Sequence, residues 1–330
     1  MHSQGRTKAV ITFWTSSLRP SKRSAMTPLH TRNREPGLTQ LDVEDKKDGI
    51  AYFESGPADA QVTVVFFHGY GLSSESFYDQ VKFLRKEFPQ VRALLVDVRG
   101  HGLSDQVPID QYTVDGAAED VLKIVAHRAQ SGKLLLVGHS LGGMVVQSFI
   151  RCAPQDVYDR IDGVLLISSA MQAFAHGGLA SFLRSGVARW LFNSAQRLPG
   201  KVNRIRWNVA RVVAPAFAAL LTGFPQMERL QFHVDMILDT PVTAFAGFFD
   251  DLVHHDEFLS ALRLKKLRGV IMVGSMDIVT PFWQSEIIQK HWPKAELHVV
   301  ERAGHMVILE EPQEVSAALG GLLRDVVAED

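Results

Sequence analysis

Short runs of apolar residues recur along the chain, separated by longer stretches of mixed character. The runs are rich in Val, Leu and Ile and lack strict alternation of apolar and polar positions. That pattern is typical of strands covered on both faces. We therefore predict buried strands at residues 63–67, 93–98, 133–137, 164–168, 270–273 and 297–300.

Helical periodicity fills the stretches between these strands. Apolar side chains recur every three or four residues at Phe77, Val81, Leu84 and Phe88. A second helix should follow Thr113, a residue type that caps helix N-termini, and a last helix should begin near Pro312. Strands that alternate with helices predict an α/β architecture with a mostly parallel central sheet flanked by helices.

The alternation stops between residues 171 and 262, where no strand pattern occurs. Helix-like stretches at 179–192 and 202–221 suggest a helical cap, or lid, inserted into the core. We accordingly predict four segments: a basic N-terminal extension (1–48), a first core part (49–170), the cap (171–262) and a second core part (263–330).

Composition narrows the function classes. The chain has 330 residues, 46% of them hydrophobic, which is enough for one core with an inserted subdomain. Its formal net charge of -1 gives no global field that favours nucleic acid. Cys152 is the single cysteine, so no intrachain disulfide can form and we expect a cytoplasmic location. No apolar run reaches the roughly 18 residues that span a bilayer, and residues 1–34, which lack acidic side chains, read as a flexible extension.

A candidate nucleophile lies where the strand at 133–137 meets a helical pattern. The sequence there is GHSLGG at 138–143, which fits G-x-S-x-G in its strand–turn–helix context. The turn must be sharp enough to expose the hydroxyl of Ser140, and side chains at Gly138 and Gly142 would clash there. The helix that follows directs its N-terminal amides at the site.

Three further motifs follow predicted strands. His68-Gly69-Tyr70-Gly71 comes after the strand at 63–67, and Gly274-Ser275-Met276-Asp277 comes after the strand at 270–273. Gly304-His305 follows the last strand. With these four motifs in this order, the sequence resembles the α/β-hydrolase fold family, in particular serine esterases and lipases with a helical cap. The resemblance covers about residues 49–170 and 263–330.

The resemblance implies a nucleophile–acid–base order of Ser140, Asp277 and His305. A neutral imidazole would take the proton of the weakly nucleophilic hydroxyl, and the carboxylate would hold the resulting imidazolium. No carboxylate follows the strand at 164–168, so Asp277 has no competitor. The family pattern assigns the oxyanion hole to the backbone N–H groups of Tyr70 and Leu141, and the nucleophile elbow to Gly138, His139 and Gly142.

Several other polar clusters read as structural. We expect His68 to support its loop, His101 to serve a structural role in the turn at 97–105, and Arg99 and Asp105 to pair or cap locally. Adjacent His254 and His255 would diverge by about 100° on a helix, so a metal site is disfavoured. We therefore interpret a group of five residues as a solvated or interdomain face: Asp250, Asp251, His254, His255 and Asp256. A secondary interpretation is that His255 or Asp256 helps to anchor the cap to the core. No metal or organic cofactor is implied.

The cap suggests the substrate. Basic residues interleaved with aromatic ones fit a lid that touches anionic lipid surfaces: Arg184, Arg189, Arg197, Lys201, Arg204, Arg206 and Arg211. An ordinary amphipathic cap with solvated arginines explains the same pattern. Apolar residues suited to an acyl pocket are Met171, Phe174, Phe217, Phe224, Phe248 and Phe249. We thus expect a small-molecule ester or lipid substrate with a hydrophobic acyl chain, cleaved by a carboxylesterase or acylglycerol lipase.

Other functions remain open on the same residues. They include thioester hydrolysis, C–C bond hydrolysis, acyl transfer and cofactor-free perhydrolysis, because the fold does not choose among them. A ligand-binding receptor that keeps the same three residues is a further alternative.

Overall fold

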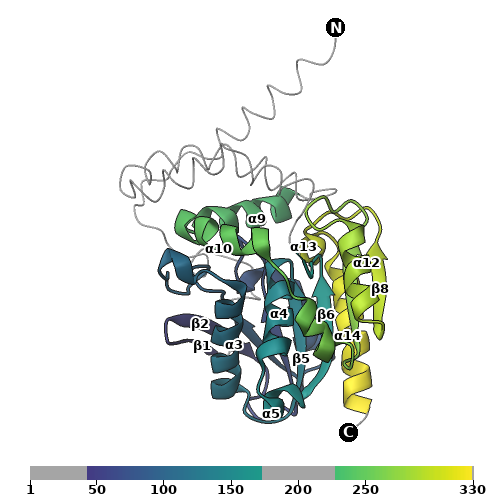
Figure 1. Cartoon of the computed structure of the whole chain (residues 1–330). Helices are drawn as coiled ribbons and strands as arrows, with labels where there is room; N and C mark the ends of the chain where they lie inside the picture. The colour runs from purple at the N-terminus through teal and green to yellow at the C-terminus, as the bar shows by residue number, and fades with distance from the viewer. Residues whose placement is uncertain (1–42, 173–226, 329–330) are drawn as a thin grey trace.

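A computed structural model of the chain describes residues 43–172 and 227–328, and a twisted sheet runs through this part (Figure 1). The sheet has eight strands in the order β1-β2-β4-β3-β5-β6-β7-β8. The strands are β1 (Val43–Lys47), β2 (Ile50–Ser55), β3 (Val62–Phe67), β4 (Arg92–Val96), β5 (Lys133–His139), β6 (Ile161–Ile167), β7 (Gly269–Gly274) and β8 (Ala295–Val300).

Strands β3 to β8 are parallel to one another, whereas β2 pairs antiparallel with both β1 and β4. A tight turn joins β1 to β2 through Asp48 and Gly49, with φ of 52° and 82°. Two consecutive positive φ values are those of the hairpin turn that suits twisted strands, and Asp-Gly is a preferred pair for it. The sheet is therefore a parallel one extended by an antiparallel hairpin at one edge.

Helices cover both faces of the sheet. The longer ones are α2 (Tyr78–Glu87), α3 (Val114–Arg128), α4 (Leu141–Cys152), α9 (Met227–Asp239), α10 (Val242–His254), α12 (Phe282–His291) and α14 (Pro312–Ala328). The short ones are α5 (Gln155–Tyr158), α11 (Ala261–Leu264), α13 (Val307–Glu310) and the 3₁₀ turns η3 (Ser74–Phe77), η4 (Ile109–Gln111) and η5 (Phe258–Ser260).

Alternate residues of the inner strands β3 to β7 enter two different cores. In β3, Val65 and Phe67 pack in the core that includes α3 and α4. Val64 and Phe66 pack in the core that includes α2 and α14. Because strand side chains alternate between faces, a strand buried on both sides reads as a continuous apolar run. The described part is thus a three-layer α/β/α arrangement.

The six predicted strands are present as β3 to β8, and the three predicted helices as α2, α3 and α14. Thr113 caps α3, since its hydroxyl accepts a hydrogen bond from the N–H of Gly116 at 3.0 Å. The sheet begins earlier than the expected core boundary, because β1 lies at 43–47. The predicted helices at 179–192 and 202–221 fall outside the described residues, whereas α9 and α10 lie together at one end of the sheet (Figure 1).

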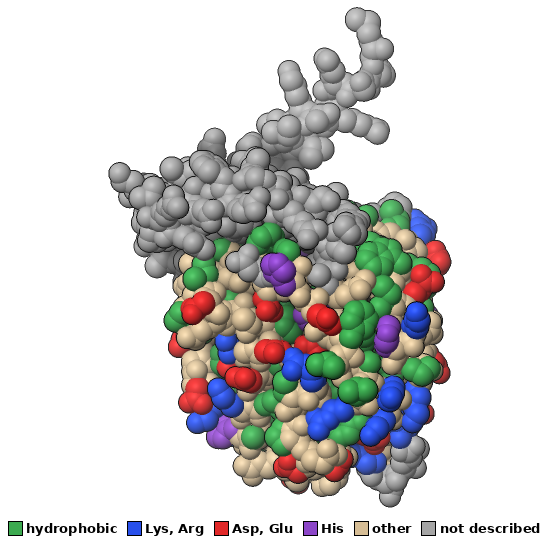
Figure 2. Space-filling model, in the orientation of Figure 1, with side chains coloured by type: hydrophobic (Ala, Val, Ile, Leu, Met, Phe, Trp, Pro, Cys, Tyr) green, Lys and Arg blue, Asp and Glu red, His purple; other side chains and the backbone are tan. Residues whose placement is uncertain are grey.

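Charged side chains of both signs are interspersed over the described part of the face in Figure 2. No helix of residues 43–172 and 227–328 is both long and apolar enough to cross a bilayer.

Candidate active site

Ser140 lies at a sharp turn between β5 and α4. Its backbone has φ 54° and ψ -118°, a conformation that is strained for a residue with a side chain. A Cβ at Gly142 would lie 1.9 Å from the carbonyl oxygen of Phe67, and one at Gly138 would lie 2.6 Å from that of Gly142. The glycines are needed because the backbone passes too close for any side chain.

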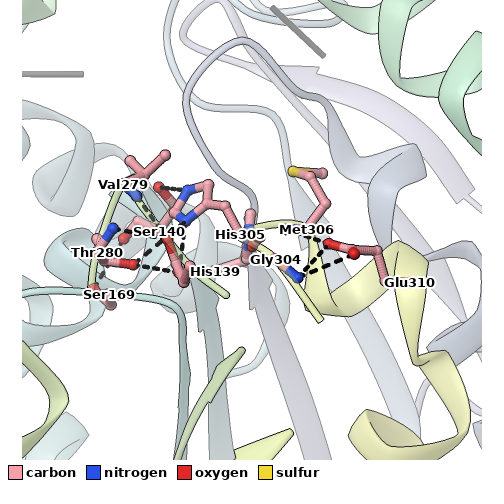
Figure 3. Close-up of polar contacts among 10 residues, drawn as sticks. His139, Ser140, Ser169, Val279, Thr280, Gly304, His305, Met306 and Glu310 are labelled. Atoms are coloured by element: carbon pink, nitrogen blue, oxygen red, sulfur yellow. Dashed lines mark hydrogen bonds and ion pairs between the residues drawn. The ribbon is translucent and has the colours of Figure 1, made fainter. Parts of the chain in front are cut away.

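His305 lies between Ser140 and the loop that follows β7 (Figure 3). Its Nε2 is 2.9 Å from the Oγ of Ser140, and its Nδ1 is 2.9 Å from Oδ2 of Asp277. All three side chains are buried, with exposed fractions of 5–7%. The hydrogen bonds require Nδ1–H to donate to the carboxylate, which leaves Nε2 free to accept the hydroxyl proton. The structure thus brings together the three residues that the sequence singled out.

The carboxylate of Asp277 is held by its own loop. Oδ1 accepts hydrogen bonds from the backbone N–H of Val279 at 2.8 Å and of Thr280 at 2.9 Å. Oδ2 accepts one from the Thr280 hydroxyl at 2.8 Å. Burial acts to raise the pKa of Asp277, but the charge of His305 and the hydrogen bonds from His305 and Thr280 outweigh it, so this pKa is lowered. Asp277 is therefore an anion suited to stabilise an imidazolium.

Glu310 fixes the loop that carries His305, a role that no sequence motif indicates. Its carboxylate accepts hydrogen bonds from the N–H of Gly304 at 3.0 Å and of Met306 at 3.1 Å, as Figure 3 shows. The loop also packs tightly on β7, because a Cβ at Gly274 would lie 2.2 Å from the carbonyl oxygen of Gly304. The orientation of His305 is thus set from both sides.

The loop after β3 lies directly beside Ser140. A Cβ at Gly69 would be 3.2 Å from the Cβ of Ser140 and 2.7 Å from Nδ1 of His139. The backbone N–H groups of Tyr70 and Leu141 make no hydrogen bond to any residue in the described part of the chain. Two such donors beside a nucleophile can receive the oxygen of a tetrahedral intermediate.

The loop after β3, which carries Tyr70, is held in place by α10 and by His101. The Tyr70 hydroxyl donates to the carbonyl of Phe245 in α10, and the two rings meet edge to face at 4.8 Å. Nε2 of His101 accepts from the N–H of Gly71 at 3.1 Å, and its Nδ1 lies 3.1 Å from the carbonyl of Arg99. His101 is therefore structural, as expected.

His68 also has a structural role. It accepts from the N–H of Val98 at 2.9 Å and lies 2.9 Å from the carbonyl of Gly69. The expected pairing of Arg99 with Asp105 is wrong. Arg99 instead binds Asp120 on α3 at 2.8 Å, and Asp105 binds Lys46 at 2.7 Å. The turn directs the guanidinium inward, where it reaches a carboxylate on a neighbouring helix.

Two more buried histidines adjoin His305. Nε2 of His139 lies 2.9 Å from the backbone carbonyl of His305, so this imidazole joins the elbow to the His305 loop. Burial, followed by the charge of His305, lowers the pKa of His139 to about 3. The same two causes lower the pKa of His233, on α9, to about 3. His233 could not be singled out from the sequence, because a lone histidine on an amphipathic helix has no diagnostic spacing.

The acidic and histidine cluster near residue 250 contacts the core. The carboxylate of Asp251 accepts from the N–H of Val114 at 2.8 Å, which caps α3 from α10. Glu257 bonds Arg151 on α4 at 3.0 Å, and Asp256 forms an isolated β-bridge with Gln172. Within the two described ranges, no group of three or more His, Cys, Asp or Glu residues could hold a metal ion.

The residues expected to form the acyl pocket divide into three groups. Met171 and Phe248 are fully buried in the core beside α3 and α4. Phe249 is partly buried. Phe174, Phe217, Phe224 and the basic residues of the cap at 184–211 lie outside the described residues.

Comparison with known proteins finds similarity to esterases and to a lipase. A bifunctional esterase/perhydrolase of Acinetobacter calcoaceticus is 39% identical over 112 residues, which cover 33% of this chain and 39% of that protein. A monoacylglycerol lipase of Bos taurus is 20% identical over 90% of this chain and 86% of its own length. A thermophilic esterase of Thermogutta terrifontis has a similar structure, with a TM-score of 0.66 and 24% identity over 84% of this chain and 93% of that one.

A match over most of the sequence agrees with the strand order, the strained turn at Ser140 and the hydrogen bonds between three distant loops. Residues 64–318 match the sequence pattern that describes the Alpha/beta hydrolase family. That match spans well over half of the 330 residues, and the chain belongs to the alpha/beta hydrolase family.

Proposed function

We propose that this chain is a serine hydrolase that cleaves a carboxylic ester through an acyl-enzyme on Ser140. One observation carries the proposal: the imidazole of His305 hydrogen-bonds the hydroxyl of Ser140 on one side and the carboxylate of Asp277 on the other, each at 2.9 Å. Such an arrangement turns a weak nucleophile into an effective one, because the base is already in contact with the proton it must remove.

The proposed reaction has two halves. Nε2 of His305 takes the hydroxyl proton while Oγ of Ser140 bonds to the ester carbonyl, and the resulting oxyanion is received by the N–H groups of Tyr70 and Leu141. The imidazolium then returns its proton to the departing alcohol, which leaves the acyl group on Ser140. A water molecule, deprotonated by the same imidazole, attacks the acyl-enzyme and releases the carboxylic acid and the free serine.

A hydrophobic acyl chain is the substrate feature that we propose. Beside the loop that carries Tyr70, the described cap residues are apolar: a Cβ at Gly71 would lie 3.0 Å from the Phe245 ring and 3.8 Å from Ile237. The name of the monoacylglycerol lipase among the relatives supports the same substrate class.

The test combines labelling with turnover. The purified protein should be labelled by a fluorophosphonate probe and should hydrolyse a series of p-nitrophenyl esters, with kcat/KM rising from the acetate to longer acyl chains. Ser140→Ala should abolish both labelling and turnover. Ser148→Ala removes another buried serine hydroxyl, one that bonds Asp115, and should retain labelling. Labelling that persists in Ser140→Ala would assign the nucleophile to another residue.

Perhydrolysis is a second candidate, supported by the name of the Acinetobacter calcoaceticus relative. The acyl-enzyme would then be attacked by hydrogen peroxide in place of water and would yield a peracid. Peracid formation from hydrogen peroxide and a carboxylic acid by the wild type, absent from Ser140→Ala, would support it. If the protein binds esters but neither turns them over nor is labelled at Ser140, the receptor alternative would be favoured.

A further inference from the structure

His233, on α9, is a buried imidazole near the site whose Nδ1 has no hydrogen-bond partner. It is 2% exposed and makes no hydrogen bond to any residue of the described ranges. The other buried imidazoles around the site, His68, His101 and His139, each contact a backbone group at 2.9–3.1 Å. A buried polar group without a partner destabilises a fold, so its presence calls for a function.

Helix α9 is held so that His233 faces the site. Arg229, one helical turn earlier, donates to Asp79 on α2 at 2.8 Å and to the carbonyl of Leu309 on α13 at 2.7 Å. Residues four apart share one face of a helix, so His233 lies on the face that packs on the core. Ile237, one turn later on the same face, is the residue that neighbours Gly71. His233 thus lies between α13, which follows His305, and the loop that carries Tyr70.

The electrostatic contacts of His233 agree with this placement. A charge on His305 lowers the pKa of His233, after the larger effect of burial, and His233 in turn acts on His139. The imidazole therefore stays neutral, with one ring nitrogen as donor and the other as acceptor. A hydroxyl group of a ligand offers the same two functions and would complement it.

Because His233 lies beside His305, it would contact the alcohol part of a bound ester. Nε2 of His305 must return the proton to the leaving alcohol, so that alcohol lies next to the imidazole of His305. The acyl carbonyl lies on the opposite side of Ser140, towards the amides of Tyr70 and Leu141.

We propose that His233 is a specificity-determining residue that hydrogen-bonds a hydroxyl group on the alcohol part of the substrate. The preferred substrates are then monoesters of diols or polyols with a hydroxyl one or two carbons from the ester oxygen. This inference rests on ester hydrolysis at Ser140 and adds the recognition of the leaving group. The contact is selective, because an alcohol without the hydroxyl leaves the buried imidazole unpaired.

The test compares two esters that share one acyl group: 2-hydroxyethyl butyrate and ethyl butyrate. The wild type should favour the hydroxylated ester by at least about tenfold in kcat/KM, chiefly through KM. His233→Leu should lower this ratio by about tenfold. His233→Asn should recover part of it, because its side-chain amide lies near the position of Nδ1. Gln231→Leu changes the opposite side of α9 and should leave the ratio as in the wild type.

A second readout separates recognition from support of the fold. His233→Leu should melt at or above the temperature of the wild type, because it removes an unpaired buried polar group. Equal kcat/KM values for the two esters in the wild type would overturn the inference, even if no variant folded. An unchanged ratio in His233→Leu would overturn it as well. Labelling of Ser140 by the fluorophosphonate probe is independent of these ratios, so its failure would instead reject the proposed function.

Discussion

Asp277 remains ionised although it is buried, because both of its carboxylate oxygens accept hydrogen bonds from different groups. Oδ1 takes two backbone N–H groups, and Oδ2 takes the Thr280 hydroxyl and the imidazole of His305. A neutral amide in its place would keep its oxygen at the backbone donors and present its NH₂ group to Nδ1 of His305. That arrangement would force the imidazole into the tautomer whose Nε2 carries the proton.

Asp277→Asn should accordingly lower kcat for a p-nitrophenyl ester on the order of 10⁴-fold, because the wrong tautomer cannot accept the serine proton. Asp105→Asn alters an exposed aspartate that pairs with Lys46 and should keep wild-type kinetics. A kcat of Asp277→Asn within tenfold of the wild type would assign the role of acid to another group.

Gly142→Ala should be among the most damaging single-methyl additions in the protein. Its Cβ would overlap the Phe67 carbonyl, and the resulting overpacking should lower the free energy of unfolding by roughly 1–3 kcal/mol or more. Gly321 in α14 has no atom within 4 Å of an added Cβ, so Gly321→Ala should raise stability by about 0.5–1 kcal/mol. Urea unfolding of the two variants tests both signs, and equal effects would contradict the close packing at the elbow.

The elements that could be predicted from the sequence are those whose buried side chains are apolar. Strands β3 to β8 appear as Val/Leu/Ile runs, but the hairpin of β1 and β2 was missed. Exposed β1 reads VEDKK, and β2 ends in Glu54 and Ser55. Glu54 is buried by ion pairs with Arg92 and Arg128, which lie 38 and 74 residues further along the chain. A local pattern cannot reveal burial that depends on such distant partners.

The candidate site shows the same division. Ser140, Asp277 and His305 lie in local motifs, so their positions were predictable. Glu310 acts through backbone N–H groups of a loop, and His233 acts through the placement of a helix. Neither role leaves a pattern in the sequence, because both depend on tertiary contacts.

The ion pair of Arg99 joins the turn after β4 to α3, and both side chains are about nine-tenths buried. Arg99→Met should cost about 3–5 kcal/mol of stability, because Asp120 is left as an unpaired buried charge. The double variant Arg99→Met/Asp120→Leu should recover most of this loss. Lys46→Met breaks an exposed pair and should cost at most about 1 kcal/mol. Additive losses in a urea-unfolding double-mutant cycle would show that Arg99 and Asp120 are not coupled.

At the scale of the molecule, several buried histidines in different parts of the fold remain neutral. Burial, as the main cause, lowers the pKa of His101, His139 and His233 to about 3 and that of His255 to about 4. The unfolded chain protonates these side chains below about pH 6.5, whereas the folded chain does not. Stability is therefore complete above that pH and is lost as the pH falls towards the lowered pKa values.

Each of these four groups should remove about 1.4 kcal/mol per pH unit below pH 6.5, or roughly 8 kcal/mol together at pH 5. That loss is comparable with the total stability of an ordinary domain, so acid unfolding near pH 5 is expected. Urea midpoints measured from pH 8 to pH 5 test this. His255→Gln should reduce the dependence of the unfolding free energy on pH by about a quarter. His298→Gln replaces an exposed histidine and should leave this dependence unchanged. A flat profile would refute the neutral buried state.

His305 lies 165 positions after Ser140, and this separation sets an order of events during synthesis. At about 5–20 residues per second, a ribosome needs roughly 8–33 s to extend the chain from the serine to the histidine. Throughout that interval the nascent polypeptide carries an inert hydroxyl, since the base that would activate it has not been made. Under the proposed mechanism, activation of Ser140 therefore has to wait until β8 and the loop after it have been synthesised.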